Sequence, residues 1–578
     1  MLRIGRKSFT VNSATMPKWH KNMQQEKKTC QNCKRGFTIE PDDFAFYEKM
    51  KVPAPVNCPR CRFQWRAIWR NEMHLYSRKC ALCGKSIMAM YNPESPYTVY
   101  CQDCWLSDKW DPASYAQDYD QKRPFFDQMG ELLKKVPKVG IFITTDLGPN
   151  INSEYANFAG SLKDCYLVFN SSPDIENSAY SRGLAYCRDV FDGYYNDKIE
   201  SGYEVVNTHS SAKVAFTQNT NDCVDCWYMY SCSGCQNCFG CVNLRHKSHY
   251  FLNKPLSKED YDKKIGEIKG SYAKMEAFRK EFESLILKEP HRENNNLKSP
   301  NSSGEYIFES KNCRDSFEAS FCEDSRYLFS NKYVKDCYDL LGHGRQSELL
   351  LDSVAVGTSQ RVIGSWWTIT SQDIFYGFCL RSSENCFGCD GLRNARYCIL
   401  NKQYSEGEYN KIVESIISEL KAKNLFGLFF PPSLSPFAYN ETVGQDNFPL
   451  TKEEALKLGF RWQDNPQITK GRETLNFQEI PDQIKDVKDS VINEILACGV
   501  CGRNYKIIQP ELFFYRKMNL PLPRKCFFCR HDDRLKRRGP MSIYDRRCAK
   551  CGKDIKTTYA PDRPEIVYCE QCYQQEVI

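Results

Sequence analysis

Sixteen of the 31 cysteines in this 578-residue chain stand in Cys-x-x-Cys pairs whose spacing occurs twice. Thiolate sulfur binds Zn2+ strongly, and two such pairs supply the four ligands of a closed tetrahedral site. Four pairs lie near each end, and adding 468 to any cysteine position in the first set gives its counterpart in the second. The sequence therefore predicts about four structural Zn2+ ions, held by Cys30, Cys33, Cys58 and Cys61; Cys80, Cys83, Cys101 and Cys104; Cys498, Cys501, Cys526 and Cys529; and Cys548, Cys551, Cys569 and Cys572.

The elements that must hold these cysteines are short. The second module of each set begins Cys-x-x-Cys-Gly-Lys, a metal knuckle in which Gly84 or Gly552 permits a positive φ. Residues 87–100 predict a β-hairpin whose second arm delivers the last cysteine pair. In the first module, the last cysteine pair is expected to open a helix.

Basic residues follow that cysteine pair in both sets. Arginines recur at intervals of four, so they share one face of the expected helix. Guanidinium groups beside aromatic rings suit phosphate contact and base stacking, although such residues can also form a solvated face or cover a zinc core. The predicted nucleic-acid-binding residues are Arg62, Arg66, Arg70, Trp65, Trp69, Arg530, Arg534, Lys536, Arg537 and Arg538.

Charge is distributed unevenly along the chain. Residues 1–85 hold 18 Lys and Arg against 6 Asp and Glu, and residues 498–563 hold 17 against 6, although the net charge is only +8. The zinc-bearing ends are therefore basic and the middle is acidic. No apolar stretch is long enough to span a bilayer, and the N-terminus lacks a signal-peptide pattern. We expect a cytoplasmic protein without membrane partners, whose thiolates bind metal rather than form disulfides.

The middle of the chain is also duplicated, since residues 156–264 align with 304–412 at an offset of 148. Within each copy, short alternating segments recur at a step of about 11 to about 12 residues, separated by Asn, Asp, Gly and Ser. This pitch predicts a β-solenoid with two strands, about 22 residues, in each coil. An antiparallel sandwich of short strands is the alternative.

Six cysteines between Cys223 and Cys241 could suggest a further metal cluster. The second copy has Ile374, Leu380 and Ser383 in place of Cys226, Cys232 and Cys235, and these cannot all be ligands. We therefore favour buried thiols stacked inside the coils. Each copy then ends in a predicted amphipathic helix, starting at Ser257 and at Ser405, that caps the stack.

The chain resembles multi-zinc-ribbon proteins of small metagenomic bacteria and giant viruses. The resemblance covers nearly the whole chain and rests on Cys58-Pro-Arg-Cys61, on residues 100–111, on Asn237-Cys-Phe-Gly-Cys241 and on residues 430–437. It implies treble-clef zinc modules and this architecture, and it implies no particular activity.

The fold expected from these patterns is mainly β with few helices: four zinc-ribbon or treble-clef modules flank two β-solenoid-like domains with capping helices. The expected segments are a basic N-terminal arm (1–29), tandem zinc modules (30–110), a helical connector (111–151), solenoid copy one (152–256), a helix and linker (257–303), solenoid copy two (304–404), a helix and connector (405–497) and the duplicate zinc modules (498–578).

Catalytic motifs do not accompany the cysteines: P-loop, GxSxG, HExxH and GxGxxG patterns are all missing from the sequence. We therefore favour a non-enzymatic nucleic-acid-binding protein, with RNA slightly preferred because aromatic residues accompany the arginines. Two alternatives stay open. One is a protein-interaction scaffold that uses the solenoid faces, and the other is a metal-dependent nuclease or nucleic-acid-modifying enzyme.

Overall fold

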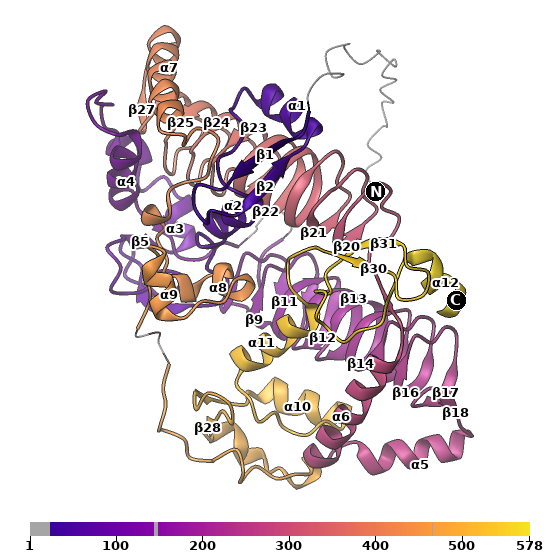
Figure 1. Cartoon of the computed structure of the whole chain (residues 1–578). Coiled ribbons are helices and arrows are strands. Elements are labelled where there is room, and N and C mark those ends of the chain that lie inside the picture. Colours follow the sequence, from indigo (N-terminus) through magenta and orange to yellow (C-terminus); the bar gives the residue numbers. More distant parts are fainter. Residues whose placement is uncertain (1–23, 144–147, 465, 467, 578) are drawn as a thin grey trace, which may run out of the picture.

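The structure, a computed structural model, describes residues 24–143, 148–464, 466 and 468–577. Most of the predicted basic arm, residues 1–23, lies outside these ranges. Figure 1 shows two long stacks of strands, one above the other, with helices and small hairpins along their sides.

The first stack, residues 156–255, is a 12-stranded sheet built mainly of parallel pairs between successive strands. Its closing pair is antiparallel. The strands are β7 (Ala156–Asn157), β8 (Leu162–Lys163), β9 (Tyr166–Phe169), β10 (Ile175–Glu176), β11 (Ala179–Ala185), β12 (Cys187–Phe191), β13 (Tyr194–Tyr203), β14 (Val206–Asn221), β15 (Val224–Tyr230), β16 (Gln236–Val242), β17 (Ser248–Phe251) and β18 (Lys254–Pro255).

The second stack, residues 304–403, is an 8-stranded sheet with the same plan: successive parallel pairs and an antiparallel closing pair. Its strands are β20 (Gly304–Phe308), β21 (Ser316–Ser320), β22 (Arg326–Gly357), β23 (Gln360–Ile363), β24 (Gln372–Phe375), β25 (Glu384–Phe387), β26 (Arg396–Ile399) and β27 (Lys402–Gln403).

Strand partners are residues i and i+12 over most of both stacks: Val224 pairs with Gln236, and Gln360 with Gln372. One layer of a stack therefore corresponds to a single step of the sequence repeat. The predicted coil of two strands is wrong, because two steps of the repeat make two complete layers. The parallel pairing also excludes the antiparallel sandwich.

A second period, of three residues, sets which side chains are buried. Between Asn219 and Asn243 every third residue has a positive φ, which gives four corners per layer. Each three-residue side between corners places one residue in the core, so Cys223, Cys226 and Met229 are all buried. The left-handed corner conformation is most accessible to Gly and to Asn or Asp, and this explains the Asn, Asp and Gly between the predicted strands.

Helices follow both stacks, as predicted. Two helices, α5 (Lys258–Ile268) and α6 (Tyr272–Lys288), follow the first stack, and α7 (Glu406–Ala422) follows the second. The predicted single helix after the first stack is interrupted at Gly270, which has a φ of +84°. A Ser side chain caps the N-terminus of each helix. Apolar residues of the helices pack on the last strands, and Phe278 lies against the ring of Phe239.

The two terminal lobes repeat one set of elements. The N-terminal lobe holds β1 (Glu26–Thr29), β2 (Gly36–Ile39), α1 (Pro41–Met50), α2 (Pro59–Ala67), β3 (Tyr76–Lys79), β4 (Ser86–Ala89), β5 (Val99–Tyr100) and α3 (Gln102–Leu106). The C-terminal lobe holds β28 (Leu496–Ala497), β29 (Asn504–Tyr505), α10 (Gln509–Met518), α11 (Phe527–Arg538), β30 (Tyr544–Arg547), β31 (Asp554–Thr557), β32 (Val567–Tyr568) and α12 (Glu570–Val577).

Residues 87–100 do not form the predicted hairpin. The knuckle closes when the Cys80 N–H donates to the Lys85 carbonyl at 2.8 Å. This contact turns β4 back onto β3 in an antiparallel pair. The later strand β5 pairs instead, in parallel, with β6 (Lys138–Val139) of the connector.

The connectors are helical in part. The first contains α4 (Phe125–Lys135), and the segment after α7 contains α8 (Val443–Asn447) and α9 (Lys452–Lys457). The predicted linker after α6 contributes β19 (His291–Arg292), which pairs with β32 of the C-terminal lobe. Across the described residues, no helix combines the length and apolarity that a bilayer crossing requires.

Candidate metal centres and the arginine helices

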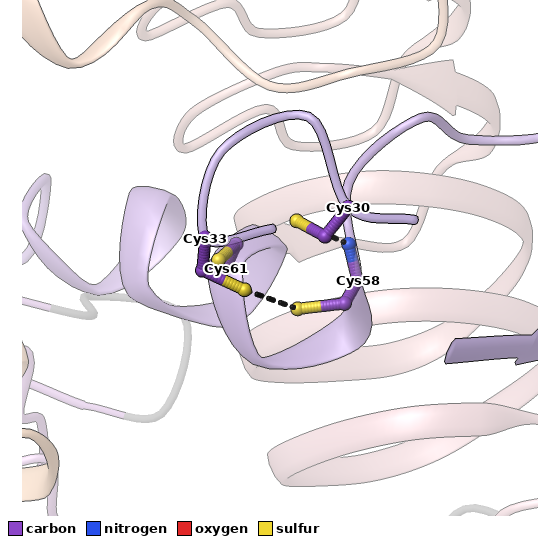
Figure 2. Close-up of side chains that lie close together, drawn as sticks. All are labelled: Cys30, Cys33, Cys58 and Cys61. Carbon is purple, nitrogen blue, oxygen red and sulfur yellow. Dashed lines mark hydrogen bonds between the residues drawn. The ribbon is translucent and has the colours of Figure 1, made fainter. Parts of the chain in front are cut away.

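The terminal cysteines form four separate groups of four, and these are the predicted sets. Within each group the sulfur atoms all lie within 4.8 Å of one another. Figure 2 shows the first group, with two cysteines from the loop after β1 and two from the start of α2. The chain thus carries four sites compatible with structural zinc.

Sulfur separations test whether these groups fit zinc. A tetrahedral ion with Zn–S bonds of about 2.3 Å holds its sulfurs about 3.8 Å apart. One pair in each site measures 3.7, 3.9, 3.7 and 3.8 Å; in chain order the pairs are Cys33–Cys58, Cys83–Cys101, Cys501–Cys526 and Cys551–Cys569. The measured pair in each group therefore has the separation expected in a zinc tetrahedron, and the remaining sulfurs lie within 4.8 Å of one another. Four thiolates would fill the coordination shell, so such an ion is structural.

Backbone and side-chain donors favour thiolate at these sites. The Cys58 N–H donates to Cys30 Sγ at 3.2 Å, and the Cys101 N–H donates to Cys80 Sγ at 3.2 Å. A hydrogen bond with Cys61 lowers the pKa of Cys58 to about 5. The same bond raises the pKa of Cys61, so within this pair Cys58 is the residue whose thiolate, the metal-binding form, is accessible at neutral pH.

The middle cysteines do not join into a comparable group among the described residues. Their thiols donate to the backbone carbonyl two residues earlier, as Cys235 does to Ser233 at 3.5 Å. The Ser383 hydroxyl, in the second stack, makes the same bond to Arg381 at 2.9 Å. The cysteines in this region follow the three-residue period of the stack, and serine can replace them.

The N-terminal arginine helix, α2, is docked on the second stack. Arg62 Nε lies 2.9 Å from Asp339 Oδ2, and Arg66 Nη2 lies 3.2 Å from Asp339 Oδ1. Arg66 also pairs with Asp352 at 2.5 Å. Burial raises the pKa of Asp352 to about 6, even though Arg66 opposes that shift. The helix face predicted to contact phosphate contacts carboxylates of the same chain instead.

The C-terminal arginine helix, α11, makes the corresponding contacts with the first stack. Arg530 Nε lies 3.0 Å from Asp192 Oδ2, and Arg534 Nη1 lies 2.6 Å from Asp192 Oδ1. Arg538 donates to the Tyr194 hydroxyl at 2.8 Å. One buried aspartate thus pairs with two arginines in each half of the molecule, and Asp352 gives Arg66 a second partner.

The helices that precede the arginine helices, α1 and α10, also make matching contacts with the two stacks. Lys49 of α1 pairs with Asp336, and Lys517 of α10 pairs with Asp189, both at 2.8 Å. Each helix also stacks one ring on the sheet, with centroid distances of 3.9 and 4.3 Å; the pairs are Phe46–Tyr338 and Phe514–Phe191. The docking is therefore crossed, because each terminal lobe contacts the stack that is more distant in the sequence (Figure 1).

The sequence contains a signal for these docking sites that the sequence analysis missed. The motif Asp-x-aromatic-Asp occurs as Asp189-Val-Phe-Asp192 and as Asp336-Cys-Tyr-Asp339. The offset between these motifs is 147, one less than the general offset of the duplication, so an alignment at 148 separates them.

Seven of the ten predicted nucleic-acid-binding residues are buried, which corrects the prediction for them. Most of the arginines bind carboxylates of the stacks, and Trp69 packs on the ring of Phe430 at 4.8 Å. Of the rest, Trp65 is half-buried, and the Lys536 side chain is 79% exposed. Arg537 lies 3.6 Å from Glu204. The seven buried residues are Arg62, Arg66, Arg70, Trp69, Arg530, Arg534 and Arg538.

A buried charge cluster joins the N-terminal lobe to both stacks. Glu72 accepts from Arg70 at 2.6 Å and from Arg182 of the first stack at 2.7 Å. Arg182 also lies 3.3 Å from Glu318 of the second stack. Burial alone raises the pKa of Glu72, but the charges of Arg182 and Arg70 bring it down to about 2. The Arg182–Glu318 ion pair therefore links the two stacks.

No protein-family model and no curated protein matches this chain.

Proposed function

We propose that this protein is a non-enzymatic, zinc-dependent binding scaffold built from two β-solenoids. In this proposal each stack is a solenoid with four three-residue sides per coil, and the terminal zinc modules clamp the stacks together. The resemblance to multi-zinc-ribbon proteins is part of the same proposal. The surfaces left to recognise partners are the outer faces of the solenoids.

The crossed arginine–aspartate docking carries this proposal. Buried ion pairs such as Arg534–Asp192 occupy the most basic helix face of each lobe. A guanidinium that is desolvated and paired with a carboxylate is not free for phosphate. The zinc modules then act on their own chain, which supports a structural role for them.

Two measurements on the zinc-loaded chain test this role. Filter binding of single-stranded RNA should give little affinity and no steep loss between about 50 and about 200 mM salt. Chelation of zinc should release the terminal lobes and expose the linker before residue 304 to protease. A chelated chain that keeps its protease resistance would exclude the clamp role.

Nucleic-acid binding is a second candidate function, favoured by exposed cations around the knuckles. Lys79 and Lys85 are exposed in the N-terminal lobe, as are Arg547 and Lys553 in the C-terminal lobe. In this case the RNA affinity would be salt-dependent and would fall in a variant with Lys79→Glu and Lys85→Glu. The matched variant Lys536→Glu, on the arginine helix, separates the two surfaces.

A further inference from the structure

The outer face of the second stack carries a groove of about 520 Å³ lined entirely by Ser, Thr, Gln and Glu. It crosses the starts of β23, β24 and β25. Its outer columns are formed by Thr358, Thr370 and Ser382 and by Gln360, Gln372 and Glu384. Lys and Arg do not contribute to the lining.

The polar groups repeat at a fixed step. Gln360 pairs in register with Gln372, and Gln372 with Glu384, so matching columns run across the strands at about 4.8 Å per layer. The serine between the columns points into the stack: the Ser371 hydroxyl donates to the Ile369 carbonyl at 2.9 Å and accepts the Ser383 N–H at 3.1 Å. The serine hydroxyls satisfy backbone hydrogen-bonding groups inside the stack, and the side chains of the outer columns lie on the solvent side.

Backbone strain marks the same groove. Thr358 and Thr370 have φ values of +49° and +52°. They are the two β-branched residues among all described non-glycine residues with positive φ. A β-branched side chain is poorly tolerated there, so folding alone disfavours threonine at these corners. Strain that is kept in two adjacent layers indicates a use for the threonine side chains outside the stack.

The first stack lacks this surface, although it has the same backbone. At the offset of 148, Ser210 and Asp222 stand where the second stack has the two threonines. Ala212 and Val224 replace Gln360 and Gln372. The two polar columns therefore do not follow from the duplicated fold, and they are a feature of the second stack.

We infer that this groove binds an extended, uncharged oligosaccharide that runs across the strands. Hydroxyl and amide groups form hydrogen bonds with sugar hydroxyls in either direction, and one sugar ring in an extended chain has a length similar to one layer. Glu348 and Glu384 accept hydrogen bonds from hydroxyls. Glu384 is paired with Arg396, and Glu348 adds a negative charge to a lining without Lys or Arg, which disfavours phosphates and uronates. The inference rests on the proposed function, because it assigns a ligand class to one outer face of the scaffold.

Titration calorimetry of the full, zinc-loaded chain with a neutral β-1,4-linked hexasaccharide tests the inference. We expect binding that weakens about tenfold or more in the double variant Gln360→Ala, Gln372→Val. These residues are those of the first stack, so the fold should be retained. Thr358→Gly should weaken binding without lowering the melting temperature, and the matched variant Ser210→Gly should leave binding unchanged.

Three outcomes would overturn the inference. They are no binding of the neutral hexasaccharide by the folded, zinc-loaded chain, equal binding by the double variant, and preferential binding of an oligouronate or of RNA. Zinc content and protease resistance are measured on the same samples. If the zinc content and the protease resistance are as expected but the hexasaccharide does not bind, the scaffold proposal stands and only the ligand class is wrong.

Discussion

The carboxylate of Asp192 lies 2.6 Å from the guanidinium of Arg534, although 342 residues separate them in the chain. Both side chains are almost completely buried. The same aspartate also binds Arg530, and Asp339 repeats this arrangement with Arg62 and Arg66. The duplication has thus kept an interface between modules as well as the modules themselves.

Asp192→Asn should destabilise the protein strongly, because it removes the carboxylate that lies 2.6 Å from buried Arg534 and leaves buried Arg530 with the more distant Glu511, at 3.8 Å. Breaking one partner of a buried pair costs about 3–5 kcal/mol. Urea unfolding at saturating zinc measures the change. The matched variant is Asp189→Asn, which removes a partly exposed pair with Lys517 and should cost about 1 kcal/mol or less. Equal effects of the two variants would contradict the role given to Asp192.

Zinc content should be about four ions per chain by native mass spectrometry. Cys526→Ser removes one of four thiolate ligands and should lower the content to about three, with loss of the helix that begins there. Structural zinc contributes directly to folding, so the variant should also unfold at a lower temperature. A purified wild-type chain that is folded and metal-free would contradict the assignment.

Cys235→Ser should leave the zinc content unchanged. The second stack already has Ser383 at the corresponding position, with the same hydrogen bond to a carbonyl. We expect a change in the free energy of unfolding of about 1 kcal/mol or less, since the thiol and the hydroxyl make equivalent contacts. Loss of a metal ion in this variant would instead place a metal among the middle cysteines.

Stability should fall in mild acid because several histidines are buried in the neutral form. Burial lowers the pKa of His291 to about 4, and its ring contacts Tyr230 at 2.9 Å and Tyr559 at 3.2 Å. The unfolded chain, with a pKa of about 6.5, binds this proton more readily than the native state does. The contribution is therefore fully present above pH about 6.5 and is lost as the pH falls towards 4.

His291→Gln removes this titration. At pH about 5.5, wild type should have lost about 1 kcal/mol more than the variant, relative to their stabilities at pH about 7.5. Urea unfolding at both pH values with excess zinc gives the comparison. Parallel pH profiles for the two proteins would show that His291 does not titrate on unfolding.

The metal ligands could be predicted from the sequence because one site lies within one module and its spacing recurs. The repeated strands were also visible, since Asn, Asp and Gly mark the corners. The length of a layer could not be predicted, because a repeat of this length fits one strand with its turn as well as one complete layer. Strand pairings between residues 12 apart, such as that of Gln360 with Gln372, distinguish the two possibilities.

The arginine faces could not be placed from the sequence for a different reason. A basic stripe on a helix has the same pattern whether phosphate or carboxylate lies opposite it. Asp339 is 277 residues from Arg62 and Asp352 is 286 residues from Arg66, and nothing local to the helix identifies these partners. The Asp-x-aromatic-Asp repeat marks the acidic partners in the sequence, but tertiary structure decides which arginines pair with them.

The crossed connection constrains the order in which the molecule can be completed during synthesis. The N-terminal lobe cannot reach its final contacts until Asp352 has left the ribosome, and the first stack has to wait for nearly the last residues of the chain. Neither half is therefore an independent unit. A nascent chain stopped in the linker would expose the arginines of α2 before their carboxylate partners have been made, and it would expose Asp189 and Asp192 before their basic partners have been made.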